Sequence, residues 1–567
     1  MIVLPSTTRG QNESESASRT LIDALLAEQS QLTAVEHFSR AYDAHEVHGR
    51  RYDHLLPATA PAPGQQYAFE VNLDQCSGCK ACVSACHSLN GLDDDETWRS
   101  VGLLIDAPNA YEAKHRAQQG FQQNITTACH HCVDPACLNG CPVLAYDKEP
   151  LTGIVRHLDD QCIGCQYCVM MCPYEVPQYS KARGIVRKCD MCHSRLAVGE
   201  APACAQACPT SAIKITVVEQ AKVRGKYRPI SRSNSHATTS AKAVARNSFL
   251  VASPNPAISL PATRFVTQRT LPKNLFAGDH SVVRPSESHL PLVMLLTLSQ
   301  FAIGASVAAV FVKPGLPLLL IALGAGLAAL VAGSLHLGQP LKAWRSFLGW
   351  RKSWFSREVI ALSTFVFFVS LAILASWSPP MKLFELFLGP LAAFAGLLTV
   401  VCSAMIYVDT RREFWSTAQC FGKFFGTTLL LGAAATLLML TRAGASQTAL
   451  AASVVSLVVA TTLKLAFEHR IFTQLVDEEA PAPTPLNKTA RLLAGELHGF
   501  VRLRIAFSLL GGLLLPLIAL LQITTNSVAV PAVVGVALGL CVAGEVIERY
   551  LFFTAVVTQK MPGGLTS

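Results

Sequence analysis

The chain has 567 residues, a formal net charge of +9, 19 cysteines and 51% hydrophobic residues. That length accommodates several domains. A basic balance is typical of proteins that bind nucleic acid or an anionic membrane surface. Long apolar runs in the second half of the chain favour the membrane and argue against nucleic acid as a partner. The composition therefore indicates a polar, cysteine-rich half followed by a membrane-embedded half.

The N-terminal region, residues 1–69, is expected to contain one helix and a linker. Apolar residues recur at helical spacing from Thr20 to about Tyr42, which predicts an amphipathic helix packed on the next domain. A Pro- and Ala-rich linker follows at 57–63. The residues after Met1 show neither a basic segment followed by an apolar one nor a twin arginine, so we expect no export signal and a reducing compartment.

Sixteen of the cysteines lie between Cys76 and Cys208, in four groups of four. Groups one and three have the spacing C-x2-C-x2-C-x3-C, group two has C-x2-C-x4-C-x3-C, and group four has C-x2-C-x11-C-x3-C. Proline follows the last cysteine of groups two, three and four. In chain order the groups are Cys76, Cys79, Cys82 and Cys86; Cys129, Cys132, Cys137 and Cys141; Cys162, Cys165, Cys168 and Cys172; and Cys189, Cys192, Cys204 and Cys208.

This spacing suits [4Fe–4S] clusters. Three close cysteines can surround three corners of a cube, and the fourth thiolate comes from elsewhere in the chain. Small residues such as Gly78, Ala81 and Gly164 let the backbone approach the cube. A zinc site needs no fourth cysteine three residues after a triplet, and a disulfide framework belongs to small secreted domains. The sequence therefore predicts four [4Fe–4S] clusters, with all sixteen cysteines as iron ligands, in a domain spanning residues 70–220.

The remaining chain is expected to be a basic linker, a membrane anchor and a short tail. Residues 221–289 form the linker: the stretch 222–284 holds eleven Lys and Arg but one acid, Asp279, and would suit anionic lipid headgroups. A spanning helix needs about 20 apolar residues, which predicts an anchor over 290–555 and a tail over 556–567. The eight apolar segments are 291–312, 316–337, 359–377, 386–408, 424–440, 447–467, 505–523 and 528–552.

The motifs resemble two subunits of one enzyme family. Residues 70–215 resemble the four-cluster subunit of dimethyl sulfoxide reductase-type molybdoenzymes, because of the four groups and the x11 gap between Cys192 and Cys204. Residues 290–553 resemble the anchor subunit of the same complexes. The matching stretches are His336-Leu337-Gly338-Gln339-Pro340, Ser356-Arg357-Glu358, and Ala543-Gly544-Glu545 with Arg549. The resemblance implies an α+β ferredoxin-like tandem cluster domain fused to an all-α eight-helix transmembrane bundle.

The resemblance also implies a division of labour and a set of cluster ligands. A separate molybdopterin-containing catalytic subunit would act on the terminal substrate, and this chain would exchange electrons with the quinone pool. The first three cysteines of one group would share a cluster with the last cysteine of its partner group. The implied sets are Cys76, Cys79, Cys82 and Cys208; Cys189, Cys192, Cys204 and Cys86; Cys129, Cys132, Cys137 and Cys172; and Cys162, Cys165, Cys168 and Cys141.

His336, Glu358 and Arg411 are the candidate residues for a quinol site. Ionisable groups at membrane depth are expensive and are functional candidates by default. His336 ends the second apolar segment and Glu358 opens the third on the same side. The alternatives are a helix-end histidine bonded to a headgroup or carbonyl, and a helix N-terminal charge. An ion pair explains Arg411 and Glu545 nearly as well. We expect no haem, because other histidines lie at or beyond segment ends.

Loop charges predict the sidedness of the membrane domain. Thirteen Lys and Arg lie on the side of the N-terminal domain and three on the opposite side. The positive-inside rule then places the cluster domain and the C-terminus in the cytoplasm, on a bacterial inner membrane. Two other interpretations stay open. In the first, electrons flow through the clusters in the reverse direction, from a dehydrogenase such as formate dehydrogenase to quinone. In the second, the chain is a cluster-bearing scaffold or redox sensor.

Overall fold

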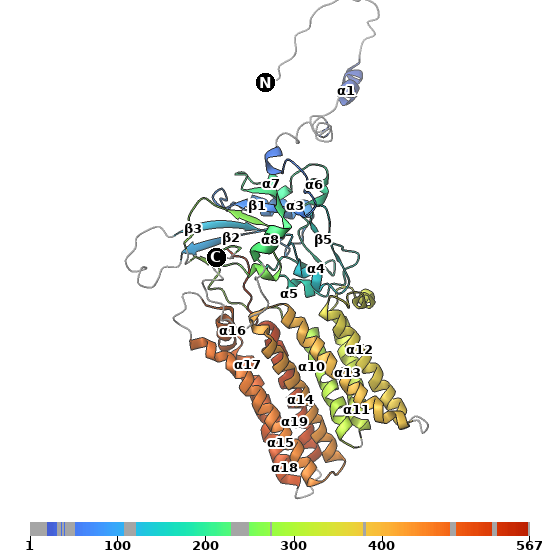
Figure 1. Cartoon of the computed structure of the whole chain (residues 1–567). Helices are drawn as coiled ribbons and strands as arrows, with labels where there is room; N and C mark the ends of the chain where they lie inside the picture. The colour runs from blue at the N-terminus through green and yellow to red at the C-terminus, as the bar shows by residue number, and fades with distance from the viewer. Residues whose placement is uncertain are drawn as a thin grey trace, which may run out of the picture.

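The computed structural model describes residues 20–30, 36, 39, 52–106, 121–227, 249–272, 275–313, 315–377, 382–476, 483–523 and 530–564. Over these ranges, a domain of short strands and helices lies at one end of a bundle of long helices (Figure 1). The expected fold class is therefore confirmed: a ferredoxin-type cluster domain precedes a helical membrane part.

The N-terminal helix is α1, Leu21–Ser30. It begins where the apolar spacing predicts, and most of the stretch from 31 to 42 lies outside the described residues. The side chains of Leu21, Ile22 and Leu26 are exposed, and α1 lies apart from the cluster domain in Figure 1. The expected packing of this helix on the next domain is therefore wrong for these side chains.

Two three-stranded sheets frame the cluster domain. In the first, β1 (Gln65–Asn72) pairs antiparallel with β8 (Ile213–Glu219), with Phe69 opposite Ile215. In the second, β2 (Ser100–Asp106) pairs with β3 (Gln122–Thr127). Two hairpins, β4–β5 (Tyr146–Lys148, Val155–His157) and β6–β7 (Gln178–Ser180, Ile185–Arg187), lie between the later cysteine groups. The β1–β8 pairing brings the two ends of the cysteine region together.

Short helices carry one or two cysteines each. They are α3 (Ala81–Asn90), α4 (Ala136–Gly140), α5 (Tyr167–Met171) and α7 (Ala203–Gln206), with α6 (His193–Ala197) and α8 (Gln220–Tyr227) beside them. Each cysteine-bearing helix is ten residues or fewer. Isolated helices of this length are marginal, so these turns depend on the packing around the thiols.

The stretch expected to be a basic linker needs a correction. Residues 228–248 and 273–274 lie outside the described part, but 249–272 and 275–289 belong to the folded cluster domain. Strand β9 (Arg264–Val266) pairs parallel with β1, and β10 (Leu275–Ala277) pairs antiparallel with β2. Phe249, Leu250 and Leu260 are buried in the same core. Apolar residues spaced among the charges complete the edges of both sheets, which composition alone does not reveal.

Within the described ranges, eight helices are long and apolar enough to cross a membrane, as the sequence predicts. The first six are α10 (Leu290–Phe311), α11 (Leu316–Leu335), α12 (Trp354–Trp377), α13 (Lys382–Asp409), α14 (Thr417–Arg442) and α15 (Gln447–His469). The seventh is built from α17 (His498–Leu509), a π-helical turn (Leu510–Leu514) and α18 (Leu515–Ile523), and the eighth is α19 (Val530–Thr554). A short helix, α16 (Pro485–Ala494), precedes the seventh span.

Two of the residues counted among the loop charges are buried within spanning helices. Lys423 belongs to α14 and Arg504 to α17, and both side chains are buried. Without these two residues, eleven Lys and Arg remain on the side of the cluster domain, against three on the opposite side. These two cations therefore need a different explanation from membrane sidedness.

Candidate functional site

The predicted iron ligands come together as four sets of thiols. The first set, Cys76, Cys79, Cys82 and Cys208, lines one small cavity. The third set, Cys129, Cys132, Cys137 and Cys172, lines another. In both cavities three cysteines come from one group and the fourth from a distant group, as the family resemblance implies.

In the other two sets, the cysteines lie close enough together to raise the pKa values of one another's thiols. Burial raises the pKa of the Cys86 thiol to about 12, and Cys204 and Cys192 contribute to the rise. These cysteines, with Cys189, form the second set. Burial also raises the pKa of Cys168, and Cys165, Cys141 and Cys162 add to it. Those four cysteines form the fourth set.

The donor set fits an iron–sulfur cluster better than a single ion. Among the described residues, no three His, Cys, Asp or Glu side chains converge on one metal-ion position. Thiolates around a cube each bind a different iron, so they need not meet at a point. Burial disfavours the thiolate form of Cys132, Cys165 and Cys189. Bound iron would compensate that cost, because metal binding drives deprotonation of the ligand.

A repeated turn shapes the start of every group. The residue two positions after the first cysteine has a positive φ in all four groups: Gly78 at 78°, His131 at 39°, Gly164 at 69° and Met191 at 61°. Only two are glycine, so the sequence shows half of this pattern. Non-glycine residues reach this region at a cost of about 1–2 kcal/mol. The turn aims backbone N–H groups at sulfur: Gly164 N–H donates to Cys162 Sγ and Met191 N–H to Cys189 Sγ, each at 3.4 Å.

Two buried cations lie between neighbouring sets. Burial lowers the pKa of Arg99, but Cys204, Cys82, Cys189 and Cys86 raise it, so the guanidinium stays charged. Burial also lowers the pKa of Lys188, and Cys129, Cys137 and Cys189 raise it. Arg99 therefore joins the first and second sets, and Lys188 joins the second and third. Sequence reasoning missed both residues, because an isolated Arg or Lys outside a motif carries no signal.

The four sets follow one another toward the membrane. Tyr146 is fully buried and interacts with Cys137 of the third set and with Cys141 and Cys168 of the fourth. At the other end, Cys79 of the first set is exposed. Helix α3, which carries Cys82 of the same set, lies in the part of the domain away from the bundle (Figure 1). The sets are therefore arranged in the order one, two, three, four, from an exposed edge of the domain to the anchor.

The loops of the fourth set dock on the anchor. Gln339 N–H donates to Ile163 O at 3.1 Å, and Ser353 Oγ donates to Gly140 O at 2.6 Å. The backbones touch closely, since a Cβ added to Gly164 would lie 2.9 Å from Gly338 N. The stretch 336–340, one of those that suggested the anchor family, therefore helps to hold the fourth set against the membrane bundle.

His336 lies at this junction and has a histidine neighbour. Its side chain is 8% exposed, and its Nε2 lies 3.3 Å from Cys165 O of the fourth set. The ring of His289, at the start of α10, packs edge-on at 5.5 Å between centroids. His289 holds a positive φ of 45°. The carbonyl contact is one of the alternatives expected for His336, but the carbonyl belongs to Cys165, a predicted cluster ligand. His289 is one of the histidines that the sequence places at or beyond the end of an apolar segment.

Glu358 lies beneath the same loops on α12. Its side chain is 5% exposed and accepts a hydrogen bond from Ser403 Oγ of α13. Tyr167 connects it to the fourth set: burial raises the Tyr167 pKa, and Asp409, Cys165 and Glu358 raise it further. The described residues show no hydrogen bond or ion pair between Glu358 and His336. The structure therefore places each candidate against the fourth set separately.

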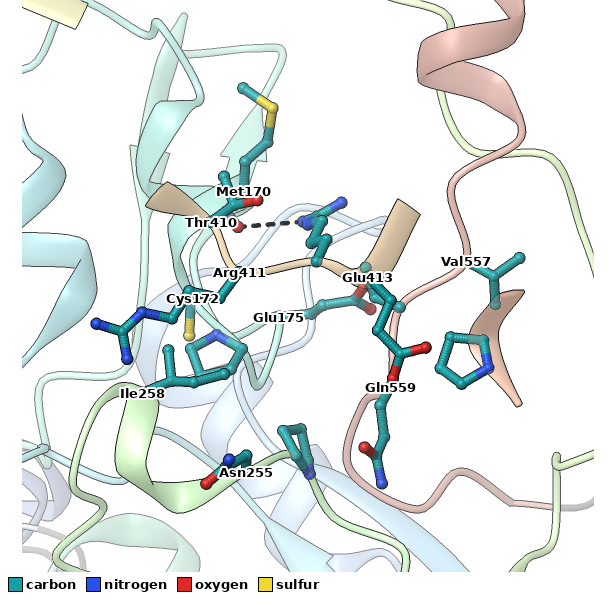
Figure 2. Close-up of a pocket in the computed structure, with 15 residues that line it drawn as sticks. Met170, Cys172, Glu175, Asn255, Ile258, Thr410, Arg411, Glu413, Val557 and Gln559 are labelled. Atoms are coloured by element: carbon teal, nitrogen blue, oxygen red, sulfur yellow. Dashed lines mark hydrogen bonds between the residues drawn. The ribbon is translucent and has the colours of Figure 1, made fainter. Parts of the chain in front are cut away.

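Arg411 lies elsewhere. Its side chain is exposed and borders a cavity of about 280 Å³ with Cys172 and Glu175 (Figure 2). The neighbouring Arg412 donates from Nη2 to Met170 O at 3.3 Å, across the junction of the two domains. Arg411 is thus near the third set, and no described contact joins it to His336 or Glu358.

Comparison with known proteins identifies both halves. Residues 121–218 match the family model for a 4Fe-4S dicluster domain, and residues 286–555 match the DMSO reductase anchor subunit (DmsC). The probable anaerobic dimethyl sulfoxide reductase subunit YnfG of Escherichia coli K12 is 36% identical over 155 residues, which cover 27% of this chain and 75% of that protein.

Two further relatives agree. The B subunit of the anaerobic dimethyl sulfoxide reductase of Haemophilus influenzae is 35% identical over 164 residues, covering 29% of this chain and 78% of that protein. The formate dehydrogenase-O iron-sulfur subunit of Escherichia coli K12 is 34% identical over 174 residues, covering 29% and 57%. With two family models in one chain, this protein belongs to the dimethyl sulfoxide reductase-type family, as an electron-transfer iron–sulfur subunit fused to its multi-pass membrane anchor.

Proposed function

We propose that the chain carries electrons from a membrane quinol, through four [4Fe–4S] clusters, to a molybdopterin-containing catalytic subunit. The observation that carries this proposal is the order of the four thiol sets, from the exposed Cys79 to the fourth set on the anchor. The clusters supply one-electron redox chemistry. An exposed outer set suits delivery to a separate protein, and an inner set against buried polar groups suits acceptance from the membrane.

His336, Glu358 and His289 are the proposed quinol residues. A quinol must be held by groups that hydrogen-bond its hydroxyls, and it must lie close to the first electron acceptor. His336 contacts the Cys165 carbonyl, and Glu358 interacts with Tyr167, which also interacts with Cys165. Both side chains are buried at the cluster-side ends of spanning helices. We leave Arg411 out of the proposed quinol residues because it borders the cavity beside the third set. Haem is also left out, since His289 and His336 pack against each other.

The test is to change His336 to Ala and Glu358 to Gln separately. Each protein should assemble with its clusters and be reduced by dithionite, and each should lose reduction by a quinol analogue. Exposed residues on the same membrane side, changed as His498→Ala and Glu496→Gln, are the matched controls and should keep quinol reduction. Normal quinol-driven reduction in both site variants would place quinol elsewhere.

The same four clusters could instead carry electrons from a dehydrogenase to quinone, since one relative is a formate dehydrogenase-O iron-sulfur subunit. Redox titration decides between the two directions. Clusters with potentials above that of the quinone pool favour quinol oxidation, and clusters below it favour quinone reduction. We further propose that the cluster domain, the catalytic partner and the C-terminus are cytoplasmic, which the loop charges support.

A further inference from the structure

A network of buried charges lies within the membrane bundle. It joins α14, α15, α17 and α19. Four cations and three acids contribute, and every side chain is at most 15% exposed. The members are Lys423, Lys464, Glu468, Arg504, Glu545, Glu548 and Arg549. Glu545 is thus explained by ion pairs, one of the alternatives expected from the sequence.

Glu548 is at the centre of this network. Its carboxylate lies 3.2 Å from Lys423 Nζ, 2.9 Å from Arg549 Nη1 and 3.8 Å from Lys464 Nζ. Despite these ion pairs, neither of its oxygens has a hydrogen-bond partner of good geometry within the described chain. Buried polar atoms in folded proteins are normally hydrogen-bonded, if not to protein then to water. A cavity of about 60 Å³ borders Glu548, Glu468 and His469, which is room enough for ordered water.

The network reaches from that cavity toward the proposed quinol residues. Arg549 Nη2 donates to Gln300 Oε1 on α10 at 2.8 Å. Tyr407 on α13 packs against Phe424 and Phe552, and the Arg549 guanidinium lies over these same two rings. Tyr407 is also close enough to Glu358 to be affected by its charge. On the other side, Arg504 binds Glu468 at 3.0 Å, and His469 is the last residue of α15. The network and the aromatic rings beside it thus extend from the surroundings of Glu358 to the cluster-side surface.

The depth of the network argues for a role beyond packing. Lys423 and Glu545 lie six and nine residues from the cluster-side ends of α14 and α19, or roughly 9–14 Å at the rise of an α-helix. Apolar side chains would join these helices at lower desolvation cost. Ionisable groups within spanning helices commonly form proton relays. Quinol oxidation at a buried site needs such a relay.

We propose that this network is the route by which protons released from quinol reach the cluster-side surface. This inference rests on the proposed quinol function. Each quinol loses two electrons to the clusters, which the catalytic partner re-oxidises. Its two O–H bonds break, and the two protons pass by way of Tyr407, Glu548 and water beside Glu468 to the surface at His469. Protons and electrons leave on the same side, so the reaction moves no net charge across the membrane.

The test uses the full-length, cluster-loaded chain in sealed vesicles with the cluster domain outside. Oxidised protein receives a quinol analogue for a single turnover, and pH dyes report on each side. Protons should appear outside, one for each electron taken up by the clusters. Glu548→Gln should slow quinol-driven cluster reduction by roughly 10²-fold, the size typical of a lost proton-transfer group. Glu548→Asp should restore most of the rate, and the exposed Glu496→Gln should behave like the parent.

Two further measurements distinguish a role of Glu548 in proton transfer from a purely structural role. Where Glu548→Gln does not assemble, Glu468→Gln, at the mouth of the cavity, should show the same slowing and a larger solvent isotope effect. The infrared difference spectrum of the parent should show a carboxyl change that is lost in Glu548→Gln. Protons released inside the vesicles, or normal rates in both assembled variants, would overturn the route. A parent whose clusters take no electrons from quinol would instead overturn the quinol function and the route with it.

Discussion

Replacing Gly338 by alanine should separate the fourth thiol set from the anchor. The new Cβ would meet the Gly184 carbonyl and would lie 2.7 Å from Tyr179 Oη. The carbonyl belongs to backbone that is fixed by the β6–β7 hairpin. The two domains must therefore move apart, at the cost of overpacking, which is about 1–3 kcal/mol.

Gly164→Ala tests the same contact from the cluster side. Its φ of 69° adds about 1–2 kcal/mol of left-handed strain to the clash with Gly184 and Gly338. The sum is roughly 2–5 kcal/mol. Gly199 is the matched control, because it has a φ of 80° but nothing within 4 Å of an added Cβ. Gly199→Ala should therefore cost only the strain.

Thermal unfolding measures the stability of the three variants, and stopped-flow measures cluster reduction by a quinol analogue. Gly338→Ala should keep its clusters and dithionite reduction while quinol-driven reduction slows, because electron-transfer rates fall steeply with distance. Gly199→Ala should transfer electrons like the parent. The docking argument would be refuted by normal quinol-driven reduction in Gly338→Ala, or by equal stability losses in Gly164→Ala and Gly199→Ala.

Other predictions concern the clusters and the membrane. Purified protein should contain about sixteen iron atoms per chain, four for each cube, and Cys79→Ser should remove or convert the outermost cluster; half that iron, or stoichiometric zinc, would contradict the assignment. Arg99→Met should lower the potentials of the two outer clusters by roughly 70 mV, taking one charge at about 10 Å and an effective dielectric constant of about 20, whereas Arg99→Lys should not; a redox titration followed by electron paramagnetic resonance measures this. Protease added to sealed right-side-out cells should spare the cluster domain, and a reporter at the C-terminus should be active only as a cytoplasmic fusion.

The sequence alone predicted which residues carry the chemistry and determined that a cluster domain precedes a membrane bundle. Cysteine spacing is local, since a triplet such as Cys162, Cys165 and Cys168 can bind three corners of a cube whatever surrounds it. Spanning helices are equally local signals, because each must satisfy its own backbone hydrogen bonds in lipid. Both features can therefore be recognised from short windows of sequence.

The tertiary structure decided the features that depend on contacts between residues far apart in the sequence. Residues 249–289 have the composition of a linker, yet β9 and β10 complete two sheets, since strand pairing depends on available edges. Arg99 and Lys188 gain a role only because folding places them between thiol sets. His289 lies beside His336 because α10 and α11 both have ends at the cluster domain. The charges of Glu545 and Glu548 are tolerated in the bundle because three other helices supply their partners.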